Sequence, residues 1–294
     1  MTGPMTCQGP PAEDVRRIVT TALAEDLRHG PDATTEATVP AGAIATAELT
    51  PRAAGVVAGL PLALAVFEEV LSGDVTVVHR GTDGDPAVPG EPVLVLRGPV
   101  RGLLVAERTA LNLLCHLSGV ATATAAWVSA VAGTGCRIRD SRKTLPGLRS
   151  AQKYAVRCGG GVNHRMALGD AVLIKDNHVV AAGSVGAALR SVREWLGRAG
   201  TPDLPCEVEV DDLDQFDEAL AAGADEILLD NFTPEQCAEA VHRRAERGAG
   251  ARLEASGGLR LATARAYAES GVDYLAVGAL THSAPALDLG MDLR

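Results

Sequence analysis

Aromatic residues, lysine and closely spaced cysteines are all scarce in this sequence. Phe, Trp and Tyr together make up 3% of its 294 residues. Surfaces that bind single-stranded nucleic acid stack bases on aromatic rings, so this composition argues against that class of protein. The formal net charge of −10 repels DNA and anionic membrane faces. A negatively charged ligand therefore needs a local positive patch.

The six cysteines are scattered along the chain, and no two of them form a CxxC pair. This pattern fits neither a zinc site nor a dense disulfide framework, so we expect reduced thiols and a cytoplasmic protein. Residues 1–11 lack a basic region followed by an apolar core. We therefore expect no signal peptide there, and we expect this terminus to be disordered.

Charged side chains are absent from residues 109–136, a stretch long enough to span a bilayer. The stretch nevertheless contains Asn112, His116 and several hydroxyl side chains, and much of the rest is alanine. We therefore interpret it as a buried pair of helices between two domains, and we expect no membrane partner.

The hydrophobic patterns divide the chain into two parts. The first third combines an amphipathic helix at 13–27, a helix at 61–71 and short strand-like runs, which predicts a small domain of helices and strands. The rest alternates strands and helices, which indicates a parallel sheet with crossover helices. Because a dinucleotide-type glycine fingerprint is missing, a closed or nearly closed α/β barrel is favoured over an open sheet. Its expected strands are 136–139, 171–174, 207–210, 226–229, 252–255 and 274–277.

Polar or glycine-rich sequence follows every expected barrel strand. Strand ends are often polar because they meet water, so one such loop alone indicates nothing. In α/β barrels, however, the carboxyl ends of the strands form one rim where active sites assemble from several loops. We therefore expect a single site there, built from Asp140-Ser141-Arg142-Lys143, Lys175-Asp176-Asn177-His178, Glu209 with Asp211-Asp212, Asp230-Asn231, Ser256-Gly257-Gly258 and Gly278.

Basic residues are concentrated in the same region. The chain uses Arg almost everywhere, and its only lysines are Lys143, Lys153 and Lys175. Residues 137–175 carry nine Lys and Arg residues and few acids, which makes a positive patch in an acidic chain. We interpret Lys153 and Arg157, spaced i and i+4 on a helix, as solvated surface charges. The candidates for anion binding are Arg142, Lys143, Arg165 and Lys175.

Two glycine-rich turns are further candidates. Residues 158–165 form a glycine turn that presents His164 and Arg165, and an Arg side chain matches a carboxylate bidentately. Ser256-Gly257-Gly258 precedes an expected helix, and helix N-termini favour anions, so this turn is a plausible phosphate cradle. Many turns between strands and helices look like this without binding a ligand.

Two carboxylates, Glu209 and Asp230, end successive expected strands. Such a pair suits a hard cation such as Mg²⁺, sugar hydroxyls or a cationic transition state. We expect Glu207 on the opposite face of its strand from Glu209, as a paired core residue rather than a ligand. The residues thus indicate an anionic, phosphorylated substrate, and they leave the reaction open.

The same residues resemble the signature of the quinolinate phosphoribosyltransferase family. Residues 140–149, DSRKTLPGLR, are similar to that family's DTRKTTPGLR. The glycine turn, His164-Arg165 and residues 173–178 follow in the family's order, and the resemblance extends from about residue 12 to the C-terminus. Ser141 replaces the usual Thr and keeps the hydroxyl, whereas Leu145 replaces the second Thr and loses any polar contact.

The resemblance implies a fold and a reaction. The fold is an N-terminal α/β sandwich domain, residues 1–118 with 281–294, joined to an incomplete TIM-like α/β barrel, residues 119–280. The reaction is the Mg²⁺-dependent transfer of phosphoribosyl from phosphoribosyl pyrophosphate to quinolinate with decarboxylation, which gives nicotinate mononucleotide for NAD biosynthesis. The resemblance also implies a homodimer in which one subunit's N-terminal domain covers the barrel rim of the other.

The resemblance also implies roles for individual residues. Quinolinate is expected to bind Ser141, Arg142, His164, Arg165 and Lys175, together with Arg108 of the partner subunit. Phosphoribosyl pyrophosphate is expected to bind Lys143, Glu209, Asp230, Ser256, Gly257, Gly258 and Gly278. Glu209 and Asp230 are also the expected Mg²⁺ ligands, directly or through water or substrate.

Three other functions remain open at this point. A paralogue of the same fold that serves molybdenum transport acts on a different substrate, but the retained cationic set, Arg142 and Lys175 included, favours quinolinate. A barrel aldolase would use Lys175 as a Schiff-base nucleophile. A non-enzymatic binding protein on this fold would not need both the carboxylates and the cations.

Overall fold

The computed structural model describes residues 8–294, which form two compact units. Within the described residues, unit 1 comprises 8–125, 143–161 and 279–294, and unit 2 comprises Ala126–Arg142 and Val162–Gly278. The expected domain boundaries differ from this division, because the segment Lys143–Gly161 groups with unit 1. Of residues 1–11, which were expected to be disordered, residues 1–7 lie outside the described residues. The next residue, Gln8, accepts a hydrogen bond through its carbonyl from Arg157 Nη2 at 2.8 Å.

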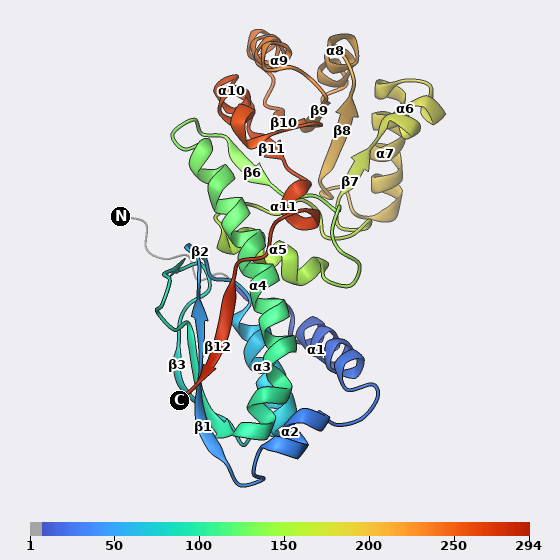
Figure 1. The fold of residues 1–294 in the computed structure, drawn as a ribbon. Helices are drawn as coiled ribbons and strands as arrows, with labels where there is room; N and C mark the ends of the chain where they lie inside the picture. The colour runs from blue at the N-terminus through green and yellow to red at the C-terminus, as the bar shows by residue number, and fades with distance from the viewer. Residues whose placement is uncertain (1–7) are drawn as a thin grey trace. The chain divides into compact units, whose positions relative to one another are not determined.

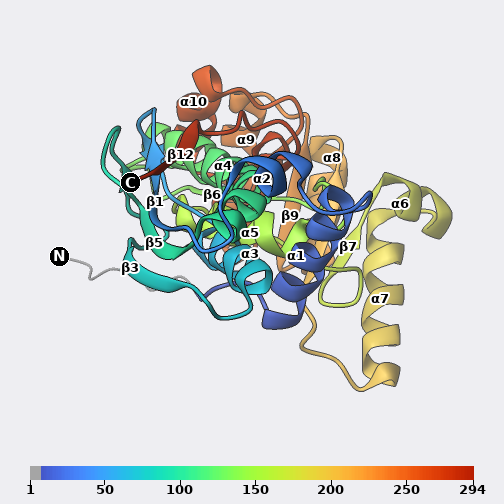
Figure 2. The same ribbon diagram turned by 60° about the horizontal axis from the view of Figure 1, so that its bottom comes forward.

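Unit 1 is built on a four-stranded antiparallel sheet in the order β12-β1-β5-β3. β1 (Ile44–Pro51) alternates inward and outward side chains, and the C-terminal strand β12 (Leu289–Leu293) pairs along its edge. Figure 2 shows β12 beside β1. The C-terminus thus completes the sheet of the first domain. The remaining elements of the unit that precede the long helix are α1 (Ala12–Asp26), α2 (Ala33–Thr38), β2 (Gly55–Val56), α3 (Leu60–Leu71), β3 (Thr76–Arg80), β4 (Pro86–Ala87) and β5 (Leu94–Pro99).

The uncharged stretch belongs to one continuous helix, α4 (Val100–Ala130), instead of the expected pair. By length and composition alone this helix could cross a membrane, but half of its most apolar window is buried inside the protein. In unit 1 the returning C-terminal segment packs tightly against it. A Cβ on Gly119 would lie 2.1 Å from the carbonyl oxygen of Pro285, and Leu287 donates its N–H to the Cys115 carbonyl at 2.9 Å. Gly119 is therefore needed for this close approach.

The surface interpretation of Lys153 is wrong. Lys153 lies on α5 (Arg149–Cys158) and is fully buried, as is its neighbour Gln152. Every residue from Ala151 to Val156 on this helix is buried, so the unit encloses α5 on more than one side. Arg157 on the same helix is only half-buried. Spacing at i and i+4 therefore did not distinguish a solvated face from an enclosed one.

Unit 2 is a parallel sheet of six strands in the order β6-β11-β10-β9-β8-β7. The last strand, β11, pairs with the first, β6, as it does in a barrel, and among the described residues no ladder joins β6 to β7. The structure is thus an incomplete α/β barrel (Figure 1), as expected. Its strands lie within about two residues of the expected bounds: β6 (Arg137–Arg139), β7 (Val172–Ile174), β8 (Cys206–Val210), β9 (Glu226–Asp230), β10 (Arg252–Ser256) and β11 (Tyr274–Ala276).

Helices follow the barrel strands and begin at capping side chains. The Ser184 hydroxyl accepts the N–H of Ala187 at the start of α7, and Asp212 and Thr233 cap the next two crossover helices in the same way. Strands such as β9 are buried along nearly their whole length, as parallel strands covered by helices should be. The helices are α6 (Asp176–Ala182), α7 (Val185–Ala199), α8 (Leu213–Ala221), α9 (Pro234–Glu246), α10 (Ala264–Glu269) with the short 3₁₀ turn η1 (Leu261–Thr263), and α11 (Ala279–His282) in unit 1.

Candidate active site

The expected rim residues of unit 2 do lie at the carboxyl ends of the parallel strands. Asp140 follows β6, Lys175 follows β7, and Glu209 is the penultimate residue of β8. Asp230 and Ser256 end β9 and β10. Because all six strands are parallel, these ends share one edge of the sheet. The barrel topology therefore brings together side chains that are far apart in sequence.

Asp140, the first residue of the signature, organises the neighbouring turn. Its carboxylate is fully buried and accepts the backbone N–H of His164 at 2.8 Å and the Asn163 side-chain amide at 2.5 Å. A buried carboxylate that accepts such bonds is held more firmly than a neutral acceptor. Asp140 thus fixes the turn that presents His164 and Arg165, a role that the sequence motif alone did not reveal.

Two guanidinium groups of unit 2 lie close to each other. Burial lowers the pKa of Arg165, and the positive charge of Arg142 lowers it further. Arg165 Nη1 donates to the carbonyl of Ala171 at 2.9 Å, while its Nε is buried without a hydrogen-bond partner. Like charges repel, and the carboxylates of Asp170 and Glu207 offset part of this repulsion, which an anionic ligand would offset further. Arg142 and Arg165 are therefore suited to hold a multiply charged anion.

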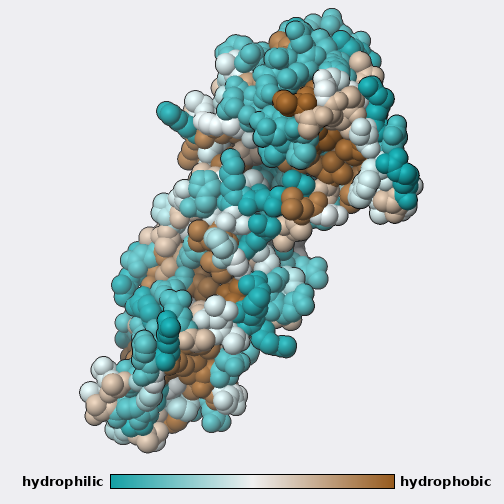
Figure 3. Space-filling view, turned by 90° about the vertical axis from the view of Figure 1, so that its right-hand side faces the viewer, coloured by the Kyte–Doolittle hydropathy of each residue, from teal (hydrophilic) through white to brown (hydrophobic). Residues whose placement is uncertain are grey.

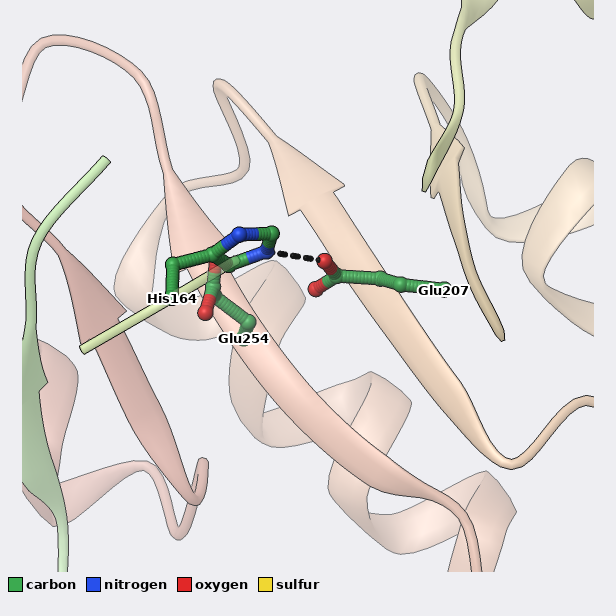
Figure 4. Close-up of side chains that lie close together, drawn as sticks. All are labelled: His164, Glu207 and Glu254. Atoms are coloured by element: carbon green, nitrogen blue, oxygen red, sulfur yellow. Dashed lines mark hydrogen bonds and ion pairs between the residues drawn. The ribbon is translucent and has the colours of Figure 1, made fainter. Parts of the chain in front are cut away.

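Both ring nitrogens of His164 form hydrogen bonds. Its Nε2 lies 2.6 Å from Glu207 Oε2 (Figure 4). Its Nδ1 accepts the N–H of Arg165 at 2.7 Å. An Nδ1 that accepts a hydrogen bond carries no proton, so the neutral ring has its proton on Nε2 and donates it to Glu207. In this arrangement both ring nitrogens contact protein groups. Through these two contacts the His164 side chain stabilises the turn at residues 158–165.

Glu207 belongs to a buried cluster of carboxylates inside the barrel. Burial raises its pKa to about 8, and the negative charge of Glu226 adds to the rise. Burial likewise raises the pKa of Glu254 to about 8, with Glu207 as the next cause. Arg139 forms ion pairs with Glu226 and, at 2.7 Å, with Glu254. Proton binding and one arginine thus offset the negative charges of the interior.

The expectation that Glu207 faces away from Glu209 is wrong. Side chains two residues apart on a strand point to the same face, because the strand repeats every two residues. The charge of Glu209 indeed contributes to the raised pKa of Glu207. The expectation that Glu207 is a paired core residue is confirmed by its contact with His164.

Lys175 pairs with the rim carboxylate of the next strand. Its Nζ lies 2.5 Å from Glu209 Oε2; half of the lysine side chain is exposed, whereas Glu209 is buried. A Schiff-base nucleophile must be a free neutral amine, whereas the amine of Lys175 is engaged by a carboxylate. This pairing argues against the aldolase alternative and supports Lys175 as an anion-binding cation.

The ends of β9 and β10 form a tight backbone corner. Asn231, with φ 57°, donates its side-chain amide to Asp230 and its N–H to the carbonyl of Ser256 at 2.9 Å. A Cβ on Gly257 would lie 2.2 Å from Asn231 Oδ1, and the φ of Gly257 is 89°. Only glycine fits there. The following α10 begins at Ala264, so its N-terminus does not directly follow Gly258 as the cradle hypothesis assumed.

A cavity of about 500 Å³ reaches His164 and Arg165 from the other end of the barrel. Its wall includes Pro205 and Asp225, which directly precede β8 and β9, so it opens at the amino ends of these strands. It does not include Glu209 or Asp230. His164 and Arg165 therefore line this cavity as well as belonging to the turn that Asp140 holds.

Three of the expected site residues, Arg108, Lys143 and Gly278, lie elsewhere in the chain. Arg108 lies on α4 in unit 1 with two-thirds of its side chain exposed. Lys143, also in unit 1, is exposed, and its carbonyl accepts the Thr281 hydroxyl at 2.8 Å. Gly278 follows β11 in unit 2 and is half-buried. The structure thus orders the backbone at Lys143, while Arg108 points to solvent within its own chain.

The expected Mg²⁺ pair, Glu209 and Asp230, is distinct from a second group of metal-ligating side chains. Within residues 8–294, the group of His, Cys, Asp and Glu close enough to hold an ion is His164 with Glu207 and Glu254. Glu209 and Asp230 bring carboxylate oxygens from neighbouring strands and need further ligands to complete a shell. Oxygen ligands are those that Mg²⁺ prefers, and substrate phosphates usually supply some of them. The two carboxylates fit that chemistry.

The buried interior was missed by sequence reasoning. Arg139 and Glu254 were not singled out, and Lys153 was placed on the surface. Residues 137–139 and 252–256 are strands of a parallel sheet that carry charged residues, which is unusual because such strands are normally apolar. That alternation of charged and apolar residues was the available signal.

Comparisons with known proteins agree over nearly the whole chain. The model of the quinolinate phosphoribosyl transferase C-terminal domain matches residues 120–292, and that of the N-terminal domain matches residues 32–118. A nicotinate-nucleotide pyrophosphorylase [carboxylating] of Mycobacterium leprae is 57% identical over 95% of this chain and 96% of its own. The human protein of the same name is 39% identical over 84% and 82%. The crystal structure of NadC from Streptococcus pyogenes is 40% identical, with a TM-score of 0.90 over 98% and 99% of the two chains.

Proposed function

Since this chain belongs to the quinolinate phosphoribosyltransferase family, we propose how its own residues carry out the family's reaction. It is a carboxylating nicotinate-nucleotide pyrophosphorylase of NAD biosynthesis. The enzyme transfers phosphoribosyl from phosphoribosyl pyrophosphate to quinolinate and releases CO₂ and pyrophosphate. The barrel rim is the proposed place of this chemistry.

Quinolinate binding rests on the paired guanidinium groups, the observation that supports the proposal most strongly. The positive charge of Arg142 adds to burial in lowering the pKa of Arg165. A dianion with two adjacent carboxylates relieves that repulsion and accepts bidentate hydrogen bonds from both. Ser141 and Lys175 add a hydroxyl and an ammonium group, and Asp140 fixes the turn that carries Arg165. His164 supports this turn through its contacts with Glu207 and the Arg165 N–H.

The phosphoribosyl donor is assigned to the neighbouring loops and strand ends. Lys143 contacts its phosphates, and the corner at Ser256, Gly257 and Gly258, with Gly278, receives the 5′-phosphate on backbone N–H groups. Tight glycine turns let backbone amides approach a phosphate closely. Glu209 and Asp230 accept the ribose hydroxyls and stabilise the positive charge that develops on the ribose as pyrophosphate leaves.

The reaction then follows from orientation. The cations hold the dianion so that its ring nitrogen faces C1 of the ribose. A bond forms from that nitrogen to C1 while the bond from C1 to pyrophosphate breaks. The ring nitrogen becomes cationic and stabilises the electron pair left at C2 when the adjacent carboxylate departs as CO₂. A proton from solvent replaces it.

Mg²⁺ is the proposed cofactor, held by Glu209 and Asp230 together with oxygens of the donor. When bound, it neutralises charge on the departing pyrophosphate. In this structure Glu209 pairs with Lys175, so Mg²⁺ would share this carboxylate with the ammonium group or displace it. Asp230 would also orient the phosphoribosyl donor toward quinolinate.

A homodimer with shared active sites is the proposed assembly, with Arg108 of the partner subunit reaching the quinolinate site. Two observations support it. Arg108 is largely exposed within its own chain, and the apolar side chains of Leu168 and Val180, which follow Arg165 and Lys175 in sequence, are exposed in unit 2. Figure 3 shows hydrophobic areas within the mostly hydrophilic surface of the protein. Exposed apolar side chains beside a site are suited to be covered by another subunit.

The cytoplasm is the proposed compartment. Cys115, Cys136, Cys158, Cys206 and Cys237 are free thiols in the structure, and free buried thiols suit a reducing environment. The molybdenum-transport alternative fits less well, since the paired arginines match two adjacent carboxylates.

The proposal is tested by a choice of acceptors. The protein is incubated with phosphoribosyl pyrophosphate, Mg²⁺ and either quinolinate or nicotinate, and products are detected by mass. We expect nicotinate mononucleotide from quinolinate only, because nicotinate lacks the carboxylate adjacent to the ring nitrogen. Equal turnover of nicotinate would contradict the assignment of two carboxylate-binding arginines.

A further inference from the structure

A buried side-chain amide in unit 1 forms a hydrogen bond with the backbone of residues 143–145, which we call the signature loop. Gln152 lies on α5 and is fully buried, and its Oε1 accepts the N–H of Leu145 at 2.9 Å. Its Nε2 donates to the carbonyl of Thr281 at 2.6 Å and lies 2.9 Å from His116 Nε2. One side chain thus joins the loop, helix α4 and the short helix α11.

The orientation of this amide is fixed by its partners. The Thr281 carbonyl can only accept, and the Leu145 N–H can only donate, so a flipped amide would face both with the wrong group. With both hydrogens of Nε2 used, His116 Nε2 must accept and the ring proton must lie on Nδ1. Burial lowers the pKa of His116, which is consistent with this neutral ring. The three partners of Gln152 therefore fix both the orientation of its amide and the position of the His116 ring proton.

Thr281 makes the second contact with the loop. Its hydroxyl donates to the carbonyl of Lys143 at 2.8 Å, and its own side chain is almost completely buried. The loop is thus held at two backbone groups, the carbonyl of Lys143 and the N–H of Leu145, by side chains that cannot reach a substrate from the core. Buried hydrogen bonds of this kind fix a single backbone conformation.

We propose that Gln152 and Thr281 are positioning residues that set the backbone of residues 143–145 so that Lys143 meets the phosphoribosyl donor. This inference rests on the role that "Proposed function" gives to Lys143. It predicts an effect on donor binding that acts through the loop. Quinolinate binding depends on Arg142, Arg165 and Lys175. Asp140 holds the turn that carries Arg165, and Glu209 pairs with Lys175.

The first test compares two substitutions at one position. Thr281→Val keeps the shape and removes the hydroxyl, and it should raise the KM for phosphoribosyl pyrophosphate about fivefold, the factor of one lost buried hydrogen bond. The KM for quinolinate should stay within twofold. Thr281→Ser restores the hydroxyl and should restore the donor KM. A donor KM in Thr281→Val within twofold of the parent would overturn the proposal.

The second test uses a substitution at Gln152 and a matched control. Gln152→Met keeps the volume, removes all three bonds and should raise the donor KM more than tenfold. The control is Ser118→Ala, which also removes a buried hydroxyl in unit 1. That hydroxyl forms hydrogen bonds with the backbone of Ala58, far from residues 143–145 in sequence. The control should leave both KM values unchanged. If Gln152→Met folds poorly, the two substitutions at Thr281 decide the question.

Combination with Lys143→Ala separates this inference from the proposed function. In the Lys143→Ala background, Thr281→Val should cause no further rise in the donor KM, because the side chain that it positions is gone. A full additional effect would show that Thr281 acts by another route and would overturn the inference. If Lys143→Ala alone leaves the donor KM unchanged, the role of Lys143 is wrong. If Lys143→Ala raises it and Thr281→Val does not, only the positioning inference fails.

Discussion

Asp140→Asn should separate the positioning of the quinolinate site from the stability of the barrel. In the parent protein, one carboxylate accepts two bonds, from the backbone N–H of His164 and from the side-chain amide of Asn163. Asparagine can accept only one of them, and its own NH₂ then faces the other donor. The substitution therefore removes one charge-assisted bond outright and weakens the other.

The size of the effect follows from these contacts. A hydrogen bond to a charged group contributes about 1.5–3 kcal/mol, and a buried unsatisfied donor adds a cost of similar size. We expect the free energy of unfolding to fall by about 3 kcal/mol in urea titrations. Because the displaced turn carries Arg165, kcat/KM for quinolinate should fall about 100-fold, equivalent to about 2.7 kcal/mol.

A control variant distinguishes positioning from general destabilisation. Asp83→Asn in unit 1 also weakens charge-assisted bonds, from the Tyr154 hydroxyl at 2.7 Å and the Gly59 N–H at 2.9 Å. It should lower stability and leave kcat/KM for quinolinate unchanged. The reasoning is refuted if Asp140→Asn keeps kcat/KM within threefold of the parent, or if both variants lose activity equally.

Three further predictions concern the rim and the interior. Arg142→Ala and Lys175→Ala should each abolish turnover while circular dichroism and unfolding curves stay close to the parent; near-normal turnover in either would contradict its assignment. Gly257→Ala should raise the KM for the phosphoribosyl donor and lower the unfolding free energy by about 1–3 kcal/mol, because its Cβ meets Asn231 Oδ1 and φ is 89°; unchanged kinetics would place the phosphate elsewhere. Glu254 has a folded pKa raised to about 8, so its contribution to stability is present below about pH 4.5 and lost as pH rises to 8. Glu254→Gln removes this loss, so its stability relative to the parent should rise between pH 5 and 8 by at most about 1.4 kcal/mol per pH unit; a flat difference across that range would show that Glu254 is ionised throughout.

The barrel could be predicted because its strands carry local patterns. Strands such as β7 and β9 are short apolar runs followed by polar residues. The same local rule places Glu209 and Asp230 at strand ends. The motif likewise identified Arg142 and Arg165 without knowledge of their contacts. These features depend on neighbours within a few residues along the chain, which a sequence displays directly.

The remaining features depend on residues far apart in sequence. Lys153 has the spacing of a surface charge, and only the packing of unit 1 around α5 shows that it is buried. The bonds of Asp140 to the turn at His164, and of Gln152 to Thr281, join segments whose meeting no periodicity reveals. Burial of charges inside the barrel is also a tertiary property, since Arg139 and its glutamates come from three different strands.

One isotope measurement tests the central claim most directly, namely that this rim joins the ring nitrogen of quinolinate to the ribose and releases the carboxylate next to it. Quinolinate labelled with ¹³C in either the C2 or the C3 carboxylate is incubated with the protein, phosphoribosyl pyrophosphate and Mg²⁺. We expect the C2 label to appear as CO₂ in a one-to-one ratio with pyrophosphate, and the C3 label to remain in nicotinate mononucleotide. Label released from C3, or pyrophosphate formed without CO₂, would contradict the account.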